Sequence, residues 1–230
     1  MVTNDDGYAA AGIRTLTKIA QLLSDDVWVV APESNQSGVG HGLTIRRPLR
    51  AREIGEQAFA VDGTPTDCVM LGLQNLVKGK PVDLVLSGIN HGSNLADDIT
   101  YSGTVAAAME ATLCRVKAIA FSSLTEHRRV PDWSAAEQYA PDLIRKLLKA
   151  GWPPEVLVNV NFPDMPAGEI QGIKVASQGT RKIGDTRNEE QPGEGTDLEV
   201  VNQGFIAVTP IHLDMTHPGS MAALRTVVEG

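Results

Sequence analysis

Three polar clusters stand where the strands of an open sheet would end. Residues 4–7 (Asn-Asp-Asp-Gly) come just after the expected first strand. Residues 33–38 follow an apolar, β-branched run at 27–31, and residues 87–94 follow a second run at 82–86. The carboxyl ends of parallel strands lie at one edge of a sheet, and ligands bind there. We therefore expect the three clusters to converge on one cleft.

The side chains in these clusters are those that hold a hard metal ion. Asp5 and Asp6 are adjacent carboxylates, which repel unless one is protonated or a cation lies between them. Ser37 and Asn90 offer further oxygen atoms, and an oxygen-only set suits Mg²⁺, Mn²⁺ or Ca²⁺. The Asp-Asp pair by itself is better explained as a helix N-cap beside a solvated neighbour. The other two clusters favour a metal site.

Basic side chains are missing from the same stretches. Residues 1–13, 29–45 and 81–114 contain no Lys or Arg. A phosphate in this cleft would therefore be held by backbone N–H groups, neutral side chains and a metal rather than by arginines. Ser102-Gly103-Thr104 precedes a predicted helix, whose N-terminus attracts anions. The same three residues would equally serve as a plain N-cap.

Charge and missing motifs exclude several classes of protein. The chain has 28 acidic and 20 basic residues and a net charge of -8, which argues against binding to DNA or anionic membranes. The glycine-rich motifs of dinucleotide-binding dehydrogenases and P-loop NTPases are absent, as is the G-x-S-x-G motif of α/β-hydrolases.

Strand and helix patterns alternate along most of the chain. Further apolar runs at 118–121 and 156–160 are typical of strands that are covered on both faces. Helical patterns cover 13–23, a segment with Thr64 as N-cap and Pro65 first, 105–114, and 135–150 with an interruption at Pro141. This alternation predicts an α/β fold with an open, mostly parallel sheet and helices on both faces.

The C-terminal third has a different pattern. Residues 184–195 are polar and predict a loop, whereas 204–210 predict a strand. With 230 residues, the length favours a single domain over 1–230. We expect residues 184–230 to contain the loop and a β extension used for association.

The cysteines and the N-terminus bear on the compartment. Cys68 and Cys114 lie in helical apolar runs, so both are expected to be unpaired core residues. This usage fits a reducing compartment. No segment approaches the roughly 20 apolar residues of a membrane span, and residues 1–6 have neither the positive region nor the apolar stretch expected of an export signal. We expect a cytoplasmic protein.

The histidines allow two interpretations each. His41 and His91 lie in or beside the polar clusters, where they would contact substrate or brace a loop. His212 and Asp214, with His217, would form an acid–base pair or a structural turn.

Several motifs in order resemble those of the stationary-phase survival protein family, SurE. The match runs from the N-terminus to about residue 182, resumes at 192–197 and 209–214, and thus covers nearly the whole chain. The motifs are Asn4-Asp5-Asp6-Gly7, the loop 31–38, Gly63-Thr64-Pro65-Thr66-Asp67-Cys68, Ser87-Gly88-Ile89-Asn90 and Tyr101-Ser102-Gly103-Thr104-Val105.

This resemblance implies a divalent-metal-dependent phosphomonoesterase with a Rossmann-like core. Its substrates would be nucleoside 5′-monophosphates, with 3′-nucleotides and polyphosphate as further ones. Its C-terminal elements would be exchanged in homodimers or homotetramers. The implied metal ligands are Asp5, Asp6, Ser37 and Asn90, with the two aspartates catalytic; the implied phosphate-side residues are Asn94, Ser102, Gly103 and Thr104.

The chain departs from the family pattern in four places. Only three residues precede residues 4–7, where family members have a full strand, and a longer stretch is absent around 184–190. We expect that this sequence lacks residues at both places, because losing a central strand would be costly. Ala11 replaces the usual Pro. The segment from Asp214 to His217 is one residue short, so no catalytic role is carried over to His217.

The sequence leaves the reaction route and two rival functions open. A bound water or a carboxylate that forms an aspartyl-phosphate would attack phosphorus. The rivals are a nucleotide-using transferase and a non-catalytic metal or nucleotide sensor of flavodoxin-like shape.

Overall fold

One sheet organises the molecule. The computed structural model describes residues 1–125, 131–181 and 192–229. Their strands are β1 (Val2–Thr3), β2 (Val29–Pro32), β3 (Ala51–Gly55), β4 (Ala58–Val61), β5 (Leu84–His91), β6 (Lys117–Ser123), β7 (Val156–Phe162), β8 (Gly172–Val175) and β9 (Phe205–His212). They form a nine-stranded sheet in the order β3-β4-β2-β1-β5-β6-β7-β9-β8. The six strands from β4 to β7 are parallel, and β3 and β9 are antiparallel to their neighbours β4 and β7.

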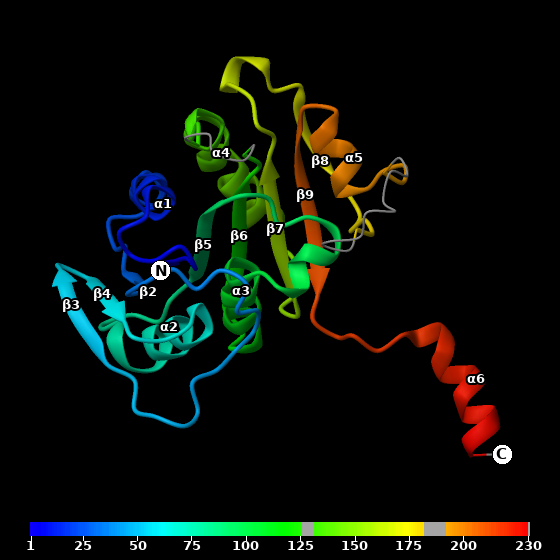
Figure 1. The fold of residues 1–230 in the computed structure, drawn as a ribbon, viewed down its shortest axis with the longest axis horizontal. Helices are drawn as coiled ribbons and strands as arrows, with labels where there is room; N and C mark the ends of the chain where they lie inside the picture. Colours follow the sequence, from blue (N-terminus) through cyan, green and yellow to red (C-terminus); the bar gives the residue numbers. More distant parts are fainter. Residues whose placement is uncertain (126–130, 182–191, 230) are drawn as a thin grey trace.

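Helices cover both faces of this sheet (Figure 1). They are α1 (Ala11–Gln21), α2 (Pro65–Leu71), a π-helix η1 (Gly72–Leu76), a 3₁₀ helix η2 (Ala96–Thr100), α3 (Gly103–Leu113), α4 (Ser134–Ala150), a 3₁₀ helix η3 (Ala167–Glu169), α5 (Asp197–Asn202) and α6 (Pro218–Val228). One hydrophobic cluster joins α1 and α4 to the sheet, and a second joins α2 and α3 to it. The predicted α/β architecture is therefore confirmed.

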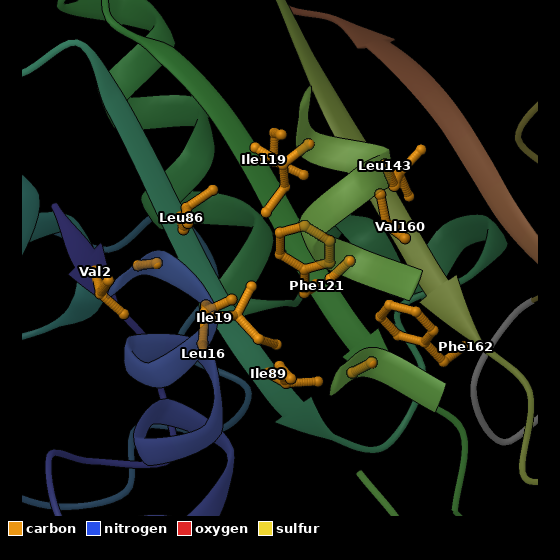
Figure 2. Close-up of a cluster of buried hydrophobic side chains, with 14 of the residues drawn as sticks. Val2, Leu16, Ile19, Leu86, Ile89, Ile119, Phe121, Leu143, Val160 and Phe162 are labelled. Carbon is orange, nitrogen blue, oxygen red and sulfur yellow. The ribbon is translucent and has the colours of Figure 1, made fainter. Parts of the chain in front are cut away.

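The larger cluster forms the core that Figure 2 shows. Phe121 of β6 and Phe162 of β7 stack with ring centroids 6.1 Å apart. Leu16 and Ile19 of α1 pack into the same cluster, as the helical spacing predicted. Because β5, β6 and β7 are covered on both faces, their central residues are buried without alternation, including the polar Asn159 and Asn161 of β7.

The end of β5 differs from its prediction. The strand continues through Ser87 to His91, so these residues lie within the strand rather than after it. Pairing with β6 shifts register between Ser87 and Asn90. Gly88 lies at this irregularity with φ +126°, and a Cβ there would be 2.2 Å from the carbonyl oxygen of Phe121. Glycine alone fits this bend, which sets the direction of Asn90.

Two further predictions were wrong. Pro141 does not interrupt α4, because a proline removes only one helical hydrogen bond while buried Ala140 and Ile144 hold the helix on the sheet. Cys114 is exposed at the C-terminal end of α3, whereas Cys68 is buried; both are free thiols.

The C-terminal part forms an extension. The strand predicted at 204–210 is confirmed as β9, and α5 packs against it. Of the loop predicted at 184–195, residues 184–191 lie outside the described residues. No residue of α6 is buried, and the helix projects away from the body (Figure 1). Within the described part of the chain, no helix is long and apolar enough to span a membrane.

Candidate active site

The three polar clusters meet where the sheet changes its winding direction. The chain passes from β1 to β2 on one side and later returns to place β5 on the other side. Such a switch point opens a crevice at the carboxyl ends of the strands. A hollow of about 260 Å³ lies there. It is lined by Asp5, Ser37, Gly38, Asn90, His91, Gly92, Ser93, Asn94, Asp98, Tyr101 and Ser102.

A second cavity lies at the opposite end of the central strand. It has a volume of about 220 Å³ and is lined by residues that include Met1, Asp26, Lys80 and Leu84. None of the predicted site residues lines it. The chemistry predicted from the sequence therefore belongs to the hollow at the switch point.

Asp5 lies almost fully buried in the floor of this hollow. Only 3% of its surface is exposed, and its Oδ1 atom accepts a hydrogen bond from the Thr104 hydroxyl of α3. Burial raises the pKa of Asp5 to about 6, although the bond from Thr104 acts in the opposite direction. The next helix along the chain, α1, has Ala10 as its N-cap and no side-chain cap bond, so Asp5 has no capping role there.

Asp6 is held between two of the clusters. Its Oδ1 atom accepts from Asn35 Nδ2 at 3.3 Å, and its Oδ2 atom accepts from the backbone N–H of His91 at 3.1 Å. Burial is the main cause that raises the pKa of Asp6. Asp6 does not line the hollow itself but links the segment after β2 to the end of β5.

The donor set fits a hard divalent cation. Of the described residues that line the hollow, none is Lys or Arg, so no basic side chain there balances the charge of Asp5. Asn90 donates its Nδ2 to the carbonyl of Gly92 at 2.8 Å, which leaves its Oδ1 available to a ligand. No group of three or more His, Cys, Asp or Glu that would hold a metal occurs among the described residues. A cation here would therefore rely on two carboxylates and neutral oxygens.

The predicted phosphate-side residues differ in what they contact. Asn94 and Ser102 line the hollow, and Ser102 also caps α3 by accepting from Val105 N–H at 3.0 Å. Thr104 instead bonds to Asp5. Gly103 lies so close to Asp5 that an added Cβ would be 2.8 Å from the Asp5 Cβ. Gly103 and Thr104 thus contact the predicted metal ligand rather than line the hollow.

Of the histidines among the described residues, only His91 lines the hollow. His41 Nε2 lies 3.0 Å from Glu110 Oε2, outside it. His212 Nδ1 is 3.2 Å from the carbonyl oxygen of Asp214, and His217 caps α6 by accepting from Ser220 N–H. In this chain, His212 and Asp214 thus make the contacts of a turn, and His217 makes those of a helix cap.

Sequence reasoning missed three residues at this site. Asp98 and Tyr101 line the hollow, and Arg181 donates to Asp98. Residues 97–98 have the pattern of a solvated helix start, and Arg181 is 83 positions away along the chain. Only the polar density of 97–102 was available as a signal.

The burial of Asp5 predicts how the stability of the metal-free protein depends on pH. The pKa of the Asp5 carboxyl is about 6 in the folded state and ordinarily 3.8, so the folded state binds the proton more tightly than the unfolded state. Stability is therefore lost as the pH rises from about 4 to about 6, by up to ~3 kcal/mol for two pKa units. We expect Asp5→Asn in chelator to gain stability over wild type across this range. Urea unfolding at pH 4, 5, 6 and 7 measures the difference, and a difference that is constant with pH would contradict it.

Residues 1–185 match the family model described as "Survival protein SurE". The chain belongs to the SurE family. The relative named 5′-nucleotidase SurE from Paramagnetospirillum magneticum is 51% identical over 244 residues, which cover 98% of this chain and 94% of the relative. A relative with the same name from Brucella anthropi is 47% identical over 237 residues, a match that covers 94% of this chain and 92% of the relative.

A solved SurE structure has the same fold. The crystal structure of the SurE protein from Aquifex aeolicus superposes with a TM-score of 0.87 at 40% identity, and 98% of each chain is covered. The resemblance predicted from the motifs is therefore confirmed, together with the fold class.

Proposed function

We propose that this chain is a SurE 5′-nucleotidase that hydrolyses the phosphate ester of nucleoside 5′-monophosphates. The names of its SurE relatives support the activity. The observation that carries the proposal is the buried carboxylate of Asp5, which has no basic partner in the hollow, beside Asp6 and the oxygens of Ser37 and Asn90. We include 3′-nucleotides and polyphosphate as further substrates.

We further propose that Asp5, Asp6, Ser37 and Asn90 hold Mg²⁺ or Mn²⁺, a site that Ca²⁺ would also occupy. A bound divalent cation polarises a phosphoryl oxygen and lowers the pKa of a coordinated water. The chain itself orients the ligands: the Thr104 hydroxyl fixes one carboxylate oxygen of Asp5, and the backbone of His91 fixes one of Asp6.

The same geometry supports a phosphate pocket in which the described part of the chain supplies neutral groups rather than Lys or Arg side chains. We propose that Asn94, Ser102 and the backbone at Gly103 and Thr104 face the substrate phosphate at the N-terminus of α3. Either aspartate is then placed to accept a proton from the attacking water or to attack phosphorus itself. Borohydride trapping during turnover distinguishes the two routes, because only the second forms an acyl phosphate.

Phosphate release from AMP tests the proposal. We expect turnover in the presence of Mg²⁺ or Mn²⁺, complete loss with excess chelator, and recovery when the cation is restored. Release of inorganic phosphate from several nucleotides, measured colorimetrically, is the readout. Transfer of phosphate to a second substrate without free phosphate would indicate the transferase, and AMP binding without product would indicate the sensor.

We also propose a homodimer or homotetramer of single-domain chains (1–230). An 11-residue helix is marginal in water on its own, yet α6 has no buried residue and exposes apolar side chains. These are Met221, Leu224, Val227 and Val228. Packing of α6 on a second copy would cover them. Both cysteines are free, which supports a cytoplasmic location.

A further inference from the structure

The segment 94–98 contributes two residues to the lining of the hollow, and its backbone conformation depends on contacts with other parts of the chain. It runs from the end of β5 into η2 and contributes Asn94 and Asp98 to the lining. Ala96, at its centre, has φ +51°, in the left-handed region that residues with a side chain adopt at a cost. Contacts from outside the segment must therefore maintain this conformation.

Asp197 provides one such contact from 101 positions further along the chain. Its carboxylate is fully buried, and its Oδ2 atom accepts from the backbone N–H of Ala96 at 2.9 Å. Its Oδ1 atom accepts from the N–H groups of Gly179 and Leu198, each at 2.9 Å. A buried carboxylate costs free energy unless it is hydrogen-bonded, and these three backbone N–H donors offset that cost.

The same part of the chain makes two more contacts with the segment. Gln178 Nε2 donates to the carbonyl oxygen of Ala96 at 3.1 Å, and the backbone N–H of Arg181 donates to Asp97 Oδ2 at 2.9 Å. The segment is thus tied to residues 178–181 and to Asp197, none of which lies in the parallel core.

The other side of the segment is fixed to the core. Asn161 of β7 accepts from Asn94 N–H at 2.9 Å and donates to the Asn94 carbonyl at 3.0 Å. Asn94 Nδ2 donates to Ser122 Oγ of β6 at 2.7 Å. The core therefore holds Asn94, and Asp197 holds the turn that follows it.

We propose that Asp197 is a positioning residue for the hydrolysis of the nucleotide. Through the N–H of Ala96 it holds the turn between Asn94, which the core fixes, and Asp98. It thereby keeps Asp98 at the wall of the hollow, so the extension completes the active site. The inference rests on the proposed function for its kinetic part, whereas the effect on the backbone of 94–98 is independent of that function.

Asp197→Asn tests this role with a nearly isosteric change. The amide oxygen can keep the two hydrogen bonds that Oδ1 accepts, but the amide NH₂ then faces the N–H of Ala96. Because both groups are donors, the hydrogen bond to Ala96 is lost. We expect kcat/KM for AMP to fall about tenfold or more, as for a buried donor left without an acceptor. We expect hydrogen exchange of the amides of 94–98 to accelerate by about the same factor.

Thr196→Ala is the matched control on the same helix. Thr196 caps α5 by accepting from Glu199 N–H and donates to the carbonyl oxygen of Gly193, so its side-chain hydrogen bonds do not involve 94–98. This variant is expected to lose thermal stability while kcat, KM and exchange over 94–98 stay at wild-type values. A purely structural role for Asp197 would make the two variants alike, and that result would overturn the proposal.

A double-mutant cycle with Asp98→Ala adds a kinetic readout that is independent of overall stability. If Asp197 acts by placing Asp98, the kinetic effects of Asp197→Asn and Asp98→Ala will be far from additive. Additive effects, or faster exchange with unchanged kinetics, would overturn the positioning role.

If Asp197→Asn does not fold, Gln178→Ala is the second variant, because it removes a hydrogen bond to the same residue, Ala96. We expect it to lower kcat/KM and to accelerate exchange over 94–98 by about two- to threefold. Unchanged kinetics and exchange in that variant would likewise overturn it.

The two proposals fail separately. If the wild-type protein releases no phosphate with any cation, the nucleotidase assignment is wrong. Comparing hydrogen exchange between Asp197→Asn and Thr196→Ala would still decide whether Asp197 holds the backbone of 94–98.

Discussion

Replacing Asp5 with asparagine is expected to lower kcat/KM for AMP hydrolysis by about a thousandfold or more. Asparagine keeps the shape of the side chain and still accepts the hydrogen bond from Thr104, but it lacks the negative charge. A metal ion supplies several kcal/mol of charge stabilisation in such a reaction, and ~4 kcal/mol corresponds to about a thousandfold in rate. Steady-state kinetics at saturating Mg²⁺ or Mn²⁺ measure the loss.

The fold of this variant should remain intact. Because burial makes the ionised form of Asp5 unfavourable, the neutral amide is expected to unfold at the same temperature as wild type or higher at neutral pH without metal. Asp142→Asn, on the exposed side of α4, removes a carboxylate that pairs with Arg145 and should leave kcat/KM unchanged. Near-normal activity of the Asp5 variant would refute its assignment as a metal ligand.

The parallel core was predictable because its signals depend on burial. The strands β5, β6 and β7 contain apolar runs at 84–86, 118–121 and 156–158, and α1 has apolar residues at helical spacing. Three of the elements that were missed lack that signal. In β3, Arg52 and Glu53 are exposed; β8 is mostly exposed, and α6 buries nothing. An element at an edge or awaiting a partner has no buried face for periodicity to mark.

The location of the site was predictable, whereas its internal contacts were not. Strand-end placement brought Asp5, Ser37 and Asn90 to one hollow, and their roles as ligands stay predictions. The role of Thr104 depends on where its hydroxyl points, which is toward Asp5. The contact of Asp197 with Ala96 joins residues 101 positions apart, a distance that no motif spans.

The same geometry explains why Asp5 is buried in a hollow in which none of the described lining residues is a lysine or arginine. The short β1 (Val2–Thr3) ends between β2 and β5, so Asp5 follows it directly into the sheet floor. The start of α3 closes over Asp5 and excludes water, which raises its pKa. An unbalanced carboxylate at this position costs stability, and a bound divalent cation would relieve that cost. Affinity for the cation and the burial of Asp5 are therefore linked.

Gly103→Ala is expected to lower kcat/KM for AMP by about a hundredfold. An added Cβ would be 2.8 Å from Asp5 Cβ and 3.1 Å from both Asp5 Oδ2 and Pro65 Cγ, so a neighbour must move. Pro65 is fixed at the start of α2, so we expect Asp5 to shift away from α3 and from Thr104. Misplacing a reacting group by about 1 Å costs about a hundredfold.

The stability of this variant separates positioning from unfolding. Overpacking is expected to cost about 1–3 kcal/mol in urea unfolding, partly offset because alanine is the better helix former. Gly168→Ala is the matched control, since it lies in η3 with nothing within 4 Å of an added Cβ, and it should retain wild-type kinetics. If Gly103→Ala kept full activity, α3 would not set the position of Asp5. A wild-type affinity for Mn²⁺ in that variant, measured calorimetrically, would lead to the same conclusion, because a displaced Asp5 is expected to bind the cation more weakly.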